Sequence, residues 1–202
     1  MKTAIVNGVP ISPEAVQFEL ERLARFYTEH GFSSDEIKKS LHELQEKALE
    51  QAIGAKLLLD RASQLELPVA AKDVDAEVAK VVREIGGEEN YKKALAAQGV
   101  SEESFRRELE KGVRVNMLVA QACSHVDEPT EKDVEDFFSA HREDYPGRTI
   151  VDVHDQVKDL LRHESRGRAM AEFVADLRAA ATVEYRETEA HCPSCAHEHG
   201  HR

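Results

Sequence analysis

The sequence runs Ala-Ile-Val-Asn-Gly-Val-Pro-Ile-Ser-Pro-Glu over residues 4–14, and this stretch combines a turn signal with a helix start. Asn7-Gly8 between two short β-branched runs is typical of a type I′ turn, so residues 4–11 are predicted to form a very small hairpin. Ser12 then has the position of an N-cap, and Pro13 follows at the first helical position. The fold is therefore expected to begin with a small hairpin that leads directly into a helix.

Apolar residues at helical spacing follow along most of the chain. The first helix carries the stripe Val16, Leu20, Leu23, Tyr27. Ser33 and Glu36 form a capping box that predicts one long helix, which ends before Leu67-Pro68. Its main apolar stripe is Ile37, Leu41, Leu44, Ala48, Ala55, Leu58, Ala62 and Leu65, and a second face holds Leu49, Ile53 and Leu57.

Shorter helical patterns and one last long one fill the remainder. They are expected at residues 74–85, around Tyr91 and Leu95 up to Gly99, at 101–120, at 130–141 and at about 151–180. Val183 and Tyr185 alternate with charged residues, which predicts a short terminal strand. Cys123 ends an apolar stripe and is expected to be a buried structural thiol. The predicted fold class is all-α, with a minimal β-sheet made from the N-terminal hairpin and the C-terminal strand.

Composition narrows the possible partners. The 202 residues include 27 Lys and Arg against 39 Asp and Glu, a formal charge of −12. This argues against nucleic acid or an anionic membrane surface as a partner. No stretch approaches the roughly 20 apolar residues of a membrane span. If Met1 is the native start, no signal peptide is present and a cytoplasmic protein is expected; a native start further upstream would allow a periplasmic one.

The C-terminal residues are unusually rich in metal-binding side chains. Thiolate and imidazole groups are ligands that Zn²⁺ and Ni²⁺ prefer, and a C-x-x-C pair can hold one tetrahedral ion. The sequence therefore predicts a Zn²⁺ or Ni²⁺ site here, and the alternative is a hydrophilic tail that binds no metal. The candidate ligands are His191, Cys192, Cys195, His197, His199 and His201.

The order of these elements resembles the N-terminal chaperone region of SurA/PrsA-like foldases. The resemblance covers about residues 1–145. It rests on the Val-Asn-Gly-Val-Pro-Ile-Ser start, the long helix that ends near Leu67-Pro68, the Gly-Val-Ser-Glu-Glu-Ser-Phe cap at residues 99–105 and the Asp-Phe-Phe segment before Tyr145. It implies a helical chaperone region at 1–146 and a returning helix and strand at 150–187 that complete the same lobe. The polar residues that follow predict a flexible Cys/His-rich tail at 188–202.

One departure from this family shapes the functional expectation. In the family a parvulin-type peptidyl-prolyl isomerase domain normally follows the position of Tyr145, whereas this chain passes directly into the Val151 helix. The family's catalytic activity therefore has no residues here to which it can be transferred, and we expect a protein that is not an enzyme, with no catalytic residues and no cofactor apart from the tail metal.

The resemblance leaves three functional hypotheses. The first is a non-catalytic SurA-like chaperone or assembly factor that binds unfolded or partly folded polypeptides and carries a metal-binding tail. The alternative is a metallochaperone that stores or delivers nickel or zinc while its helices dock on a target enzyme; the third is an isomerase with an unrecognised site. A homodimer formed by exchange of the hairpin and the terminal strand is also consistent with the pattern. Most apolar residues are expected in the core, so none is assigned to client binding.

Overall fold

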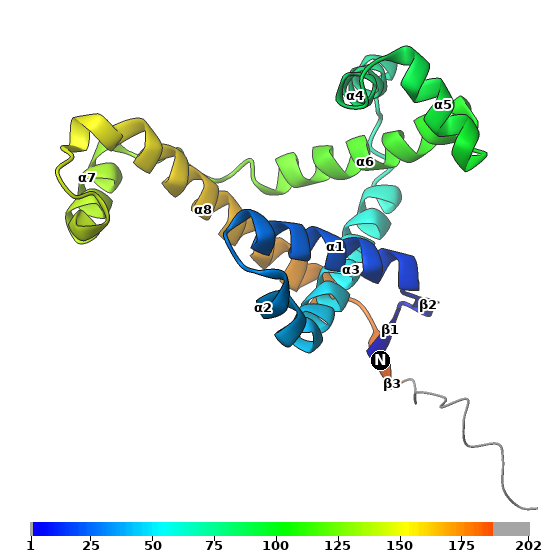
Figure 1. Cartoon of the computed structure of the whole chain (residues 1–202), viewed down its shortest axis with the longest axis horizontal. Coiled ribbons are helices and arrows are strands. Elements are labelled where there is room, and N and C mark those ends of the chain that lie inside the picture. Colours follow the sequence, from blue (N-terminus) through cyan, green and yellow to red (C-terminus); the bar gives the residue numbers. More distant parts are fainter. Residues whose placement is uncertain (1, 188–202) are drawn as a thin grey trace, which may run out of the picture. The chain divides into compact units, whose positions relative to one another are not determined.

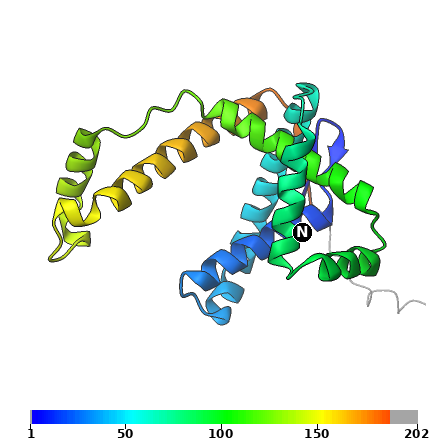
Figure 2. The same ribbon diagram turned by 90° about the horizontal axis from the view of Figure 1, so that it is seen from above.

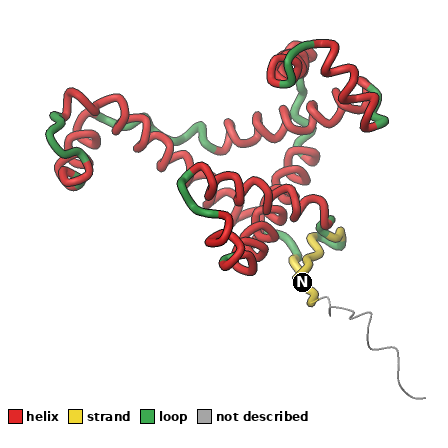
Figure 3. The backbone as a smooth tube through the Cα atoms, in the orientation of Figure 1, coloured by secondary structure: helices red, strands yellow, loops and turns green. Residues whose placement is uncertain are grey.

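The computed structural model describes residues 2–187 and divides them into two compact units. Unit 1 contains residues 2–57 and 178–187, and unit 2 contains Leu58–Leu177. Helices make up most of the described chain, and the strands lie together at one place (Figure 3). This confirms the predicted all-α fold with a minimal sheet.

The small sheet joins the two ends of the described chain within unit 1. Strand β1 (Lys2–Val6) lies between β2 (Val9–Pro10) and β3 (Val183–Glu187), and both pairings are antiparallel. Val6 pairs with Val9 on one side and with Val183 on the other. The predicted pairing of the hairpin with the terminal strand is therefore confirmed. Exchange of these strands between two chains stays a prediction.

Asn7 has two roles in this sheet. Asn7 and Gly8 both have positive φ angles, 49° and 80°, as the predicted type I′ turn requires. The Asn7 side-chain oxygen also accepts a hydrogen bond from the backbone N–H of Thr182 at 3.0 Å, and the Asn7 N–H donates to the Thr182 carbonyl at 2.8 Å. The turn therefore also fixes the residue that precedes β3.

The helices of unit 1 begin where the caps predict. In α1 (Pro13–Glu29) the Ser12 hydroxyl accepts from the N–H of Ala15, and in α2 (Ser34–Lys39) Ser33 and Glu36 form the capping box. The single long helix expected after Ser33 is wrong, because Ser40 divides it into α2 and α3 (Leu41–Gln64). Ser40 still donates to the Glu36 carbonyl and accepts from the Leu44 N–H. Serine is a poor residue for a helix interior, which explains a division at this point.

Both apolar faces predicted for α3 are buried along the helix. Leu49, Ile53 and Leu57 of the second face are almost fully buried, and so are three residues of the main stripe: Leu44, Ala48 and Ala62. Leu41 and Leu65 of the main stripe are exposed. Leu41 is the first residue of α3 and Leu65 follows its last residue, Gln64, so the exposed positions lie at the two ends of the helix.

A polar network attaches the sheet of unit 1 to α3. The Tyr185 hydroxyl donates to Glu50 at 2.6 Å, and Arg178 pairs with the other oxygen of Glu50 at 2.6 Å and also contacts the tyrosine hydroxyl. Lys2 lies 5.7 Å from the centre of the Tyr185 ring and forms an ion pair with Glu46. The terminal strand is thus held on α3 by side chains as well as by backbone pairing.

Unit 2 begins with the end of α3 and continues through three helices, α4 (Ala71–Glu84), α5 (Glu88–Gln98) and α6 (Glu102–Ala122). Gly99 ends α5 in the left-handed region at φ 65°, and Ser101 caps α6, both as predicted. Arg106 of α6 pairs with Asp75 of α4, and Arg114 donates to the Leu67 carbonyl at 3.1 Å. These contacts hold α6 against α4 and the segment before it.

The other part of unit 2 is a helical hairpin. In two views α7 (Glu131–Ala140) lies beside the first turns of α8 (Ile150–Ala179), with the short helix η1 (Arg142–Asp144) between them (Figure 1, Figure 2). A closed apolar cluster joins α7 and α8: Val134, Phe138, Val153 and Val157. Residues 145–149 connect η1 directly to α8, so the part of the chain that the structure describes contains no parvulin domain at this point.

Cys123 corrects one expectation about the core. The thiol is only partly buried at the C-terminal end of α6, and its sulfur lies 3.8 Å from the Arg166 carbonyl. Cys123 is the C-cap residue of α6, one position after its last helical residue, whereas the buried residues of this helix are Val113 and Leu118. The predicted domain ranges 1–146, 150–187 and 188–202 stay a prediction.

Candidate functional site

Several large apolar side chains of unit 1 are left in contact with solvent. Phe18 is 64% exposed, Phe26 is 51% exposed and Phe32 is 47% exposed. Phe18 lies about 200° around α1 from both Val16 and Leu20, on the side of the helix opposite the partly buried stripe. Burying any of these rings in a partner would be favourable, because transfer of apolar area out of water stabilises the bound state.

A hollow lies next to one of these rings, that of Phe32. It has a volume of about 310 Å³ and is formed by the end of α1, by α2 and by the start of α3. Tyr27 and Phe32 meet edge to face with ring centres 5.1 Å apart, and Phe26 contacts Tyr27 at 5.7 Å. Ile37 and Leu44 complete the apolar part of its lining. The hollow can therefore accept an apolar side chain of moderate size.

The rim of this hollow carries charges of both signs. Glu36 and Glu43 stand near Lys39 and Lys47, and the Lys47 ammonium donates to the Tyr27 hydroxyl at 3.4 Å. The Ser33 hydroxyl and then the Ser33 N–H donate to Glu36, which lowers the pKa of that carboxyl below its ordinary value. Two acids and two bases leave the rim without a strong preference for the charge of a bound segment.

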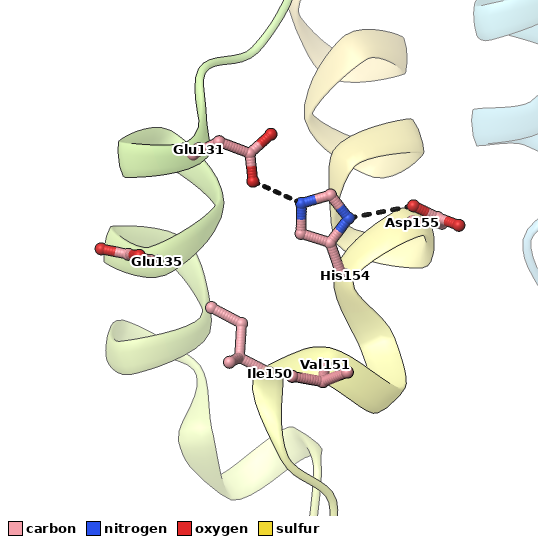
Figure 4. A pocket seen from close by; sticks show the side chains of 6 residues that line it. All are labelled: Glu131, Glu135, Ile150, Val151, His154 and Asp155. Carbon is pink, nitrogen blue, oxygen red and sulfur yellow. Dashed lines mark hydrogen bonds and ion pairs between the residues drawn. The ribbon is translucent and has the colours of Figure 1, made fainter.

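A second pocket lies in unit 2, on the α7–α8 hairpin. Its volume is about 370 Å³, and Figure 4 shows His154 between Glu131 and Asp155, with Ile150 and Val151 below. The His154 ring contacts Glu131 through Nε2 at 2.6 Å and Asp155 through Nδ1 at 2.9 Å. These two bonds, first that with Asp155, raise the pKa of His154 above its ordinary value of 6.5.

The predicted metal ligands His191, Cys192, Cys195, His197, His199 and His201 all lie outside the described residues. Within residues 2–187, no group of three or more His, Cys, Asp or Glu side chains is placed to hold a metal ion. No helix in the same range combines the length and the apolar character needed to cross a membrane. The metal prediction therefore continues to rest on the sequence alone.

The apolar pattern of the sequence assigns no residue to client binding, and the sequence does not single out His154. A usable signal existed for Phe18 and Phe26, because both are large apolar residues outside the 16–20–23–27 stripe of their helix. No local signal existed for His154, because its partner Glu131 is 23 residues away in the sequence.

The small sheet that closes on both ends of the described chain, together with long helices, places the molecule in the class of SurA-like helical chaperone folds. The chain belongs to the family of SurA-like N-terminal domains, because the sequence model of that family matches residues 1–119. No curated protein matches the chain.

A solved structure supports the same fold. It comes from work on the virulence factor PEB4 and the periplasmic protein Cj1289, two structurally related SurA-like chaperones of Campylobacter jejuni. The similarity covers 92% of this chain and 99% of that chain with a TM-score of 0.57, and the sequences are 13% identical. At this level of identity the similarity concerns the fold.

Proposed function

We propose that this protein binds unfolded or partly folded polypeptides and keeps them from aggregating, without isomerising them. The observation that carries the proposal is the exposed aromatic surface of unit 1, defined as Phe18, Phe26 and Phe32, of which Phe32 lines the 310 Å³ hollow. Membership of the SurA-like family supports a chaperone-type role. The neighbour of known structure is described as a SurA-like chaperone, which agrees with the same role.

The energetics fit loose binding of many clients. A phenylalanine ring that buries about 100 Å² of apolar area contributes about 2.5 kcal/mol at roughly 25 cal/mol per Å². A few such contacts, set against the cost of ordering an unfolded chain, correspond to weak binding. The mixed charges on the rim of the hollow do not form a fixed set of polar contacts that would select one particular client sequence.

The test is suppression of aggregation with surface variants. A permanently unfolded reporter, such as reduced α-lactalbumin, is followed by light scattering with and without the protein. Phe18→Gln combined with Phe26→Gln should reduce the suppression severalfold, because the replaced rings leave less apolar area for a client to cover. Circular dichroism should be unchanged, since neither ring lies in the core.

The matched control replaces an exposed apolar residue away from this surface. Val151 is 82% exposed in unit 2, so Val151→Gln should leave the suppression unchanged. Equal loss in the control and in the double variant would mean that the aromatic surface has no special role. Full suppression by the double variant would refute the assignment of client binding to this surface.

The proposal includes a metal-binding tail. Cys192 and Cys195 stand at C-x-x-C spacing, with His197, His199 and His201 close behind and His191 just before. This spacing favours a tetrahedral Zn²⁺ with two sulfur and two nitrogen ligands, and Ni²⁺ is the second choice. The composition of the tail is also the one observation that favours the metallochaperone alternative.

One deletion separates these two functions. Aggregation suppression that persists in a protein without residues 188–202 would favour the chaperone role. Loss of nickel or zinc delivery to a target enzyme on the same deletion would favour the metallochaperone. Both readouts are needed because a chaperone with a metal-responsive tail would also bind the metal.

A further inference from the structure

A stripe of basic residues runs along α8 and faces acidic residues at the start of α7. His154, Lys158, Arg162 and Arg166 are spaced four residues apart, so they lie on one side of the helix. Their acidic partners are Glu128 and Glu131. The contacts are His154–Glu131 at 2.6 Å, Lys158–Glu131 at 2.9 Å, Arg162–Glu128 at 2.6 Å and Arg166–Glu128 at 3.6 Å.

Only the histidine of this stripe has an ordinary pKa near neutral pH. Both of its ring nitrogens face a carboxylate, Glu131 on one side and Asp155 on the other (Figure 4). An ionised carboxylate only accepts hydrogen bonds, and a neutral imidazole has only one N–H to donate. Both contacts can therefore be hydrogen bonds only when His154 carries two protons and a positive charge.

We propose that His154 is a pH-sensitive clasp, which holds α7 against the first turns of α8 when the imidazole is protonated and loosens that packing when it loses its proton. The charged groups around the ring are Glu131 and Glu135 from α7, and Asp155 and Lys158 from α8 itself. Glu135 points away from the ring (Figure 4), so Glu131 provides the link to α7.

The direction of the pH effect follows from the pKa of His154. The contacts with Asp155 and Glu131 raise this pKa above its ordinary value of 6.5. Opening of α7 removes the Glu131 contact and leaves Asp155 of the same helix beside the ring, so the closed hairpin binds the proton more tightly than the open hairpin through Glu131. The stabilisation is fully present below the pKa of His154 in the open hairpin. It is lost as the pH rises through the higher pKa of the closed hairpin.

The change is a local loosening and not separation of the hairpin. Val134 and Val157 are fully buried and Val153 nearly so, and this apolar cluster does not depend on the charge of His154. Lys158 also keeps its contact with Glu131 at any pH near neutral. The clasp should thus change how often α7 opens while the rest of unit 2 remains folded.

Hydrogen exchange of the full-length protein measures this opening. Protection of peptides that cover α7 is compared between about pH 5.5 and pH 8.5, after correction for the intrinsic exchange rates. The His154 pKa is measured on the same protein by NMR. Asp155 stays beside the ring when α7 opens, so only the Glu131 contact is linked to opening. Linkage therefore requires that the opening constant rise between these limits by ten raised to the difference between the His154 pKa of the wild type and that of Glu131→Gln. Peptides from α5, in the same unit, serve as the internal reference and should not change.

Two variants and one control make the test specific. His154→Gln removes the titrating group, so the protection of α7 should no longer respond to pH. His163→Gln replaces an exposed histidine of the same helix and should respond like the wild type. Glu131→Gln keeps His154 but removes its partner on α7, so both the pKa of His154 and the pH response should decrease.

The outcomes are decisive in both directions. A pH response of α7 that disappears in His154→Gln and persists in His163→Gln supports the clasp. An unchanged response in His154→Gln overturns it, as does a His154 that titrates at its ordinary pKa. If His154→Gln does not fold, the decreased response of Glu131→Gln decides the question in the same way.

Discussion

Replacing Asn7 by alanine tests how strongly one turn residue holds the two ends of the described chain together. Asn7 has a φ of 49°, in the region that most L residues avoid, and its side-chain oxygen accepts from the Thr182 N–H at 3.0 Å. Alanine removes the side-chain acceptor and leaves a residue less suited to positive φ. Both effects weaken the attachment of β3 to β1.

The magnitude can be built from the two effects. Loss of one hydrogen bond at an exposed position costs about 0.5–1.5 kcal/mol. The left-handed conformation costs an ordinary L residue about 1–2 kcal/mol, and asparagine tolerates it better than alanine. We therefore expect Asn7→Ala to lower the free energy of opening of the sheet by about 2 kcal/mol, roughly a thirtyfold change in the opening constant.

Two further variants separate the effects. Asn7→Gly frees the backbone but loses the acceptor, so it should cost about 1 kcal/mol. Asn7→Asp keeps an acceptor and tolerates positive φ, so its cost should be smallest. The assay is native-state hydrogen exchange of peptides that cover β1 and β3. Equal opening constants for Asn7→Ala and the wild type would refute the reasoning. If Asn7→Ala and Asn7→Gly lower the free energy of opening by the same amount, the positive φ angle makes no contribution.

Three further predictions concern the core, catalysis and the tail. Ile53→Ala should lower the free energy of unfolding in urea by about 2–5 kcal/mol, because Ile53 is fully buried, whereas Leu41→Ala should cost much less because that side chain is largely exposed. The purified protein should not accelerate cis–trans conversion of an X-Pro peptide; the uncatalysed reaction takes tens to hundreds of seconds, so even modest catalysis would be visible by fluorescence. Calorimetric titration should show that Zn²⁺ binds the full chain but not a 1–187 truncation. Cys192→Ser and Cys195→Ser should each weaken Zn²⁺ binding more than any single histidine replacement does. Binding should also weaken as the pH falls through about 6.5, because protonated imidazole cannot bind a metal.

Local signals in the sequence predicted the elements well. Ser12, Ser33, Ser101 and Thr130 cap helices through hydrogen bonds to residues three positions later, so their effect can be recognised without the fold. Asn7-Gly8 predicted its turn for the same reason. These interactions span only a few residues, and propensity and spacing are enough to identify them.

The burial of helix faces could not be predicted in the same way. The sequence offered two apolar faces on α3 and did not indicate how much of each would be enclosed; the fold buries Ile53 and Ala48, one from each face, and leaves Leu41 exposed. The pairing of His154 with Glu131 likewise depends on contact between distant segments. Those contacts depend on the tertiary fold, and the spacing of apolar residues along one helix does not indicate which distant segment the helix will meet.

The negative net charge should keep molecules that expose aromatic residues apart, and it leads to a last prediction. The formal charge of −12 makes molecules repel one another at neutral pH, while Phe18 and Phe26 offer apolar area that favours association. Near the isoelectric point of about 5.3 the repulsion vanishes, so the wild type should self-associate there, as dynamic light scattering would show. Salt at pH 7.5 should produce part of the same effect, because it screens the repulsion but leaves apolar contacts intact. The Phe18→Gln, Phe26→Gln double variant should remain dispersed under both conditions. If this variant and the wild type associate equally at pH 5.3, another surface drives the self-association, and the aromatic side chains of α1 do not.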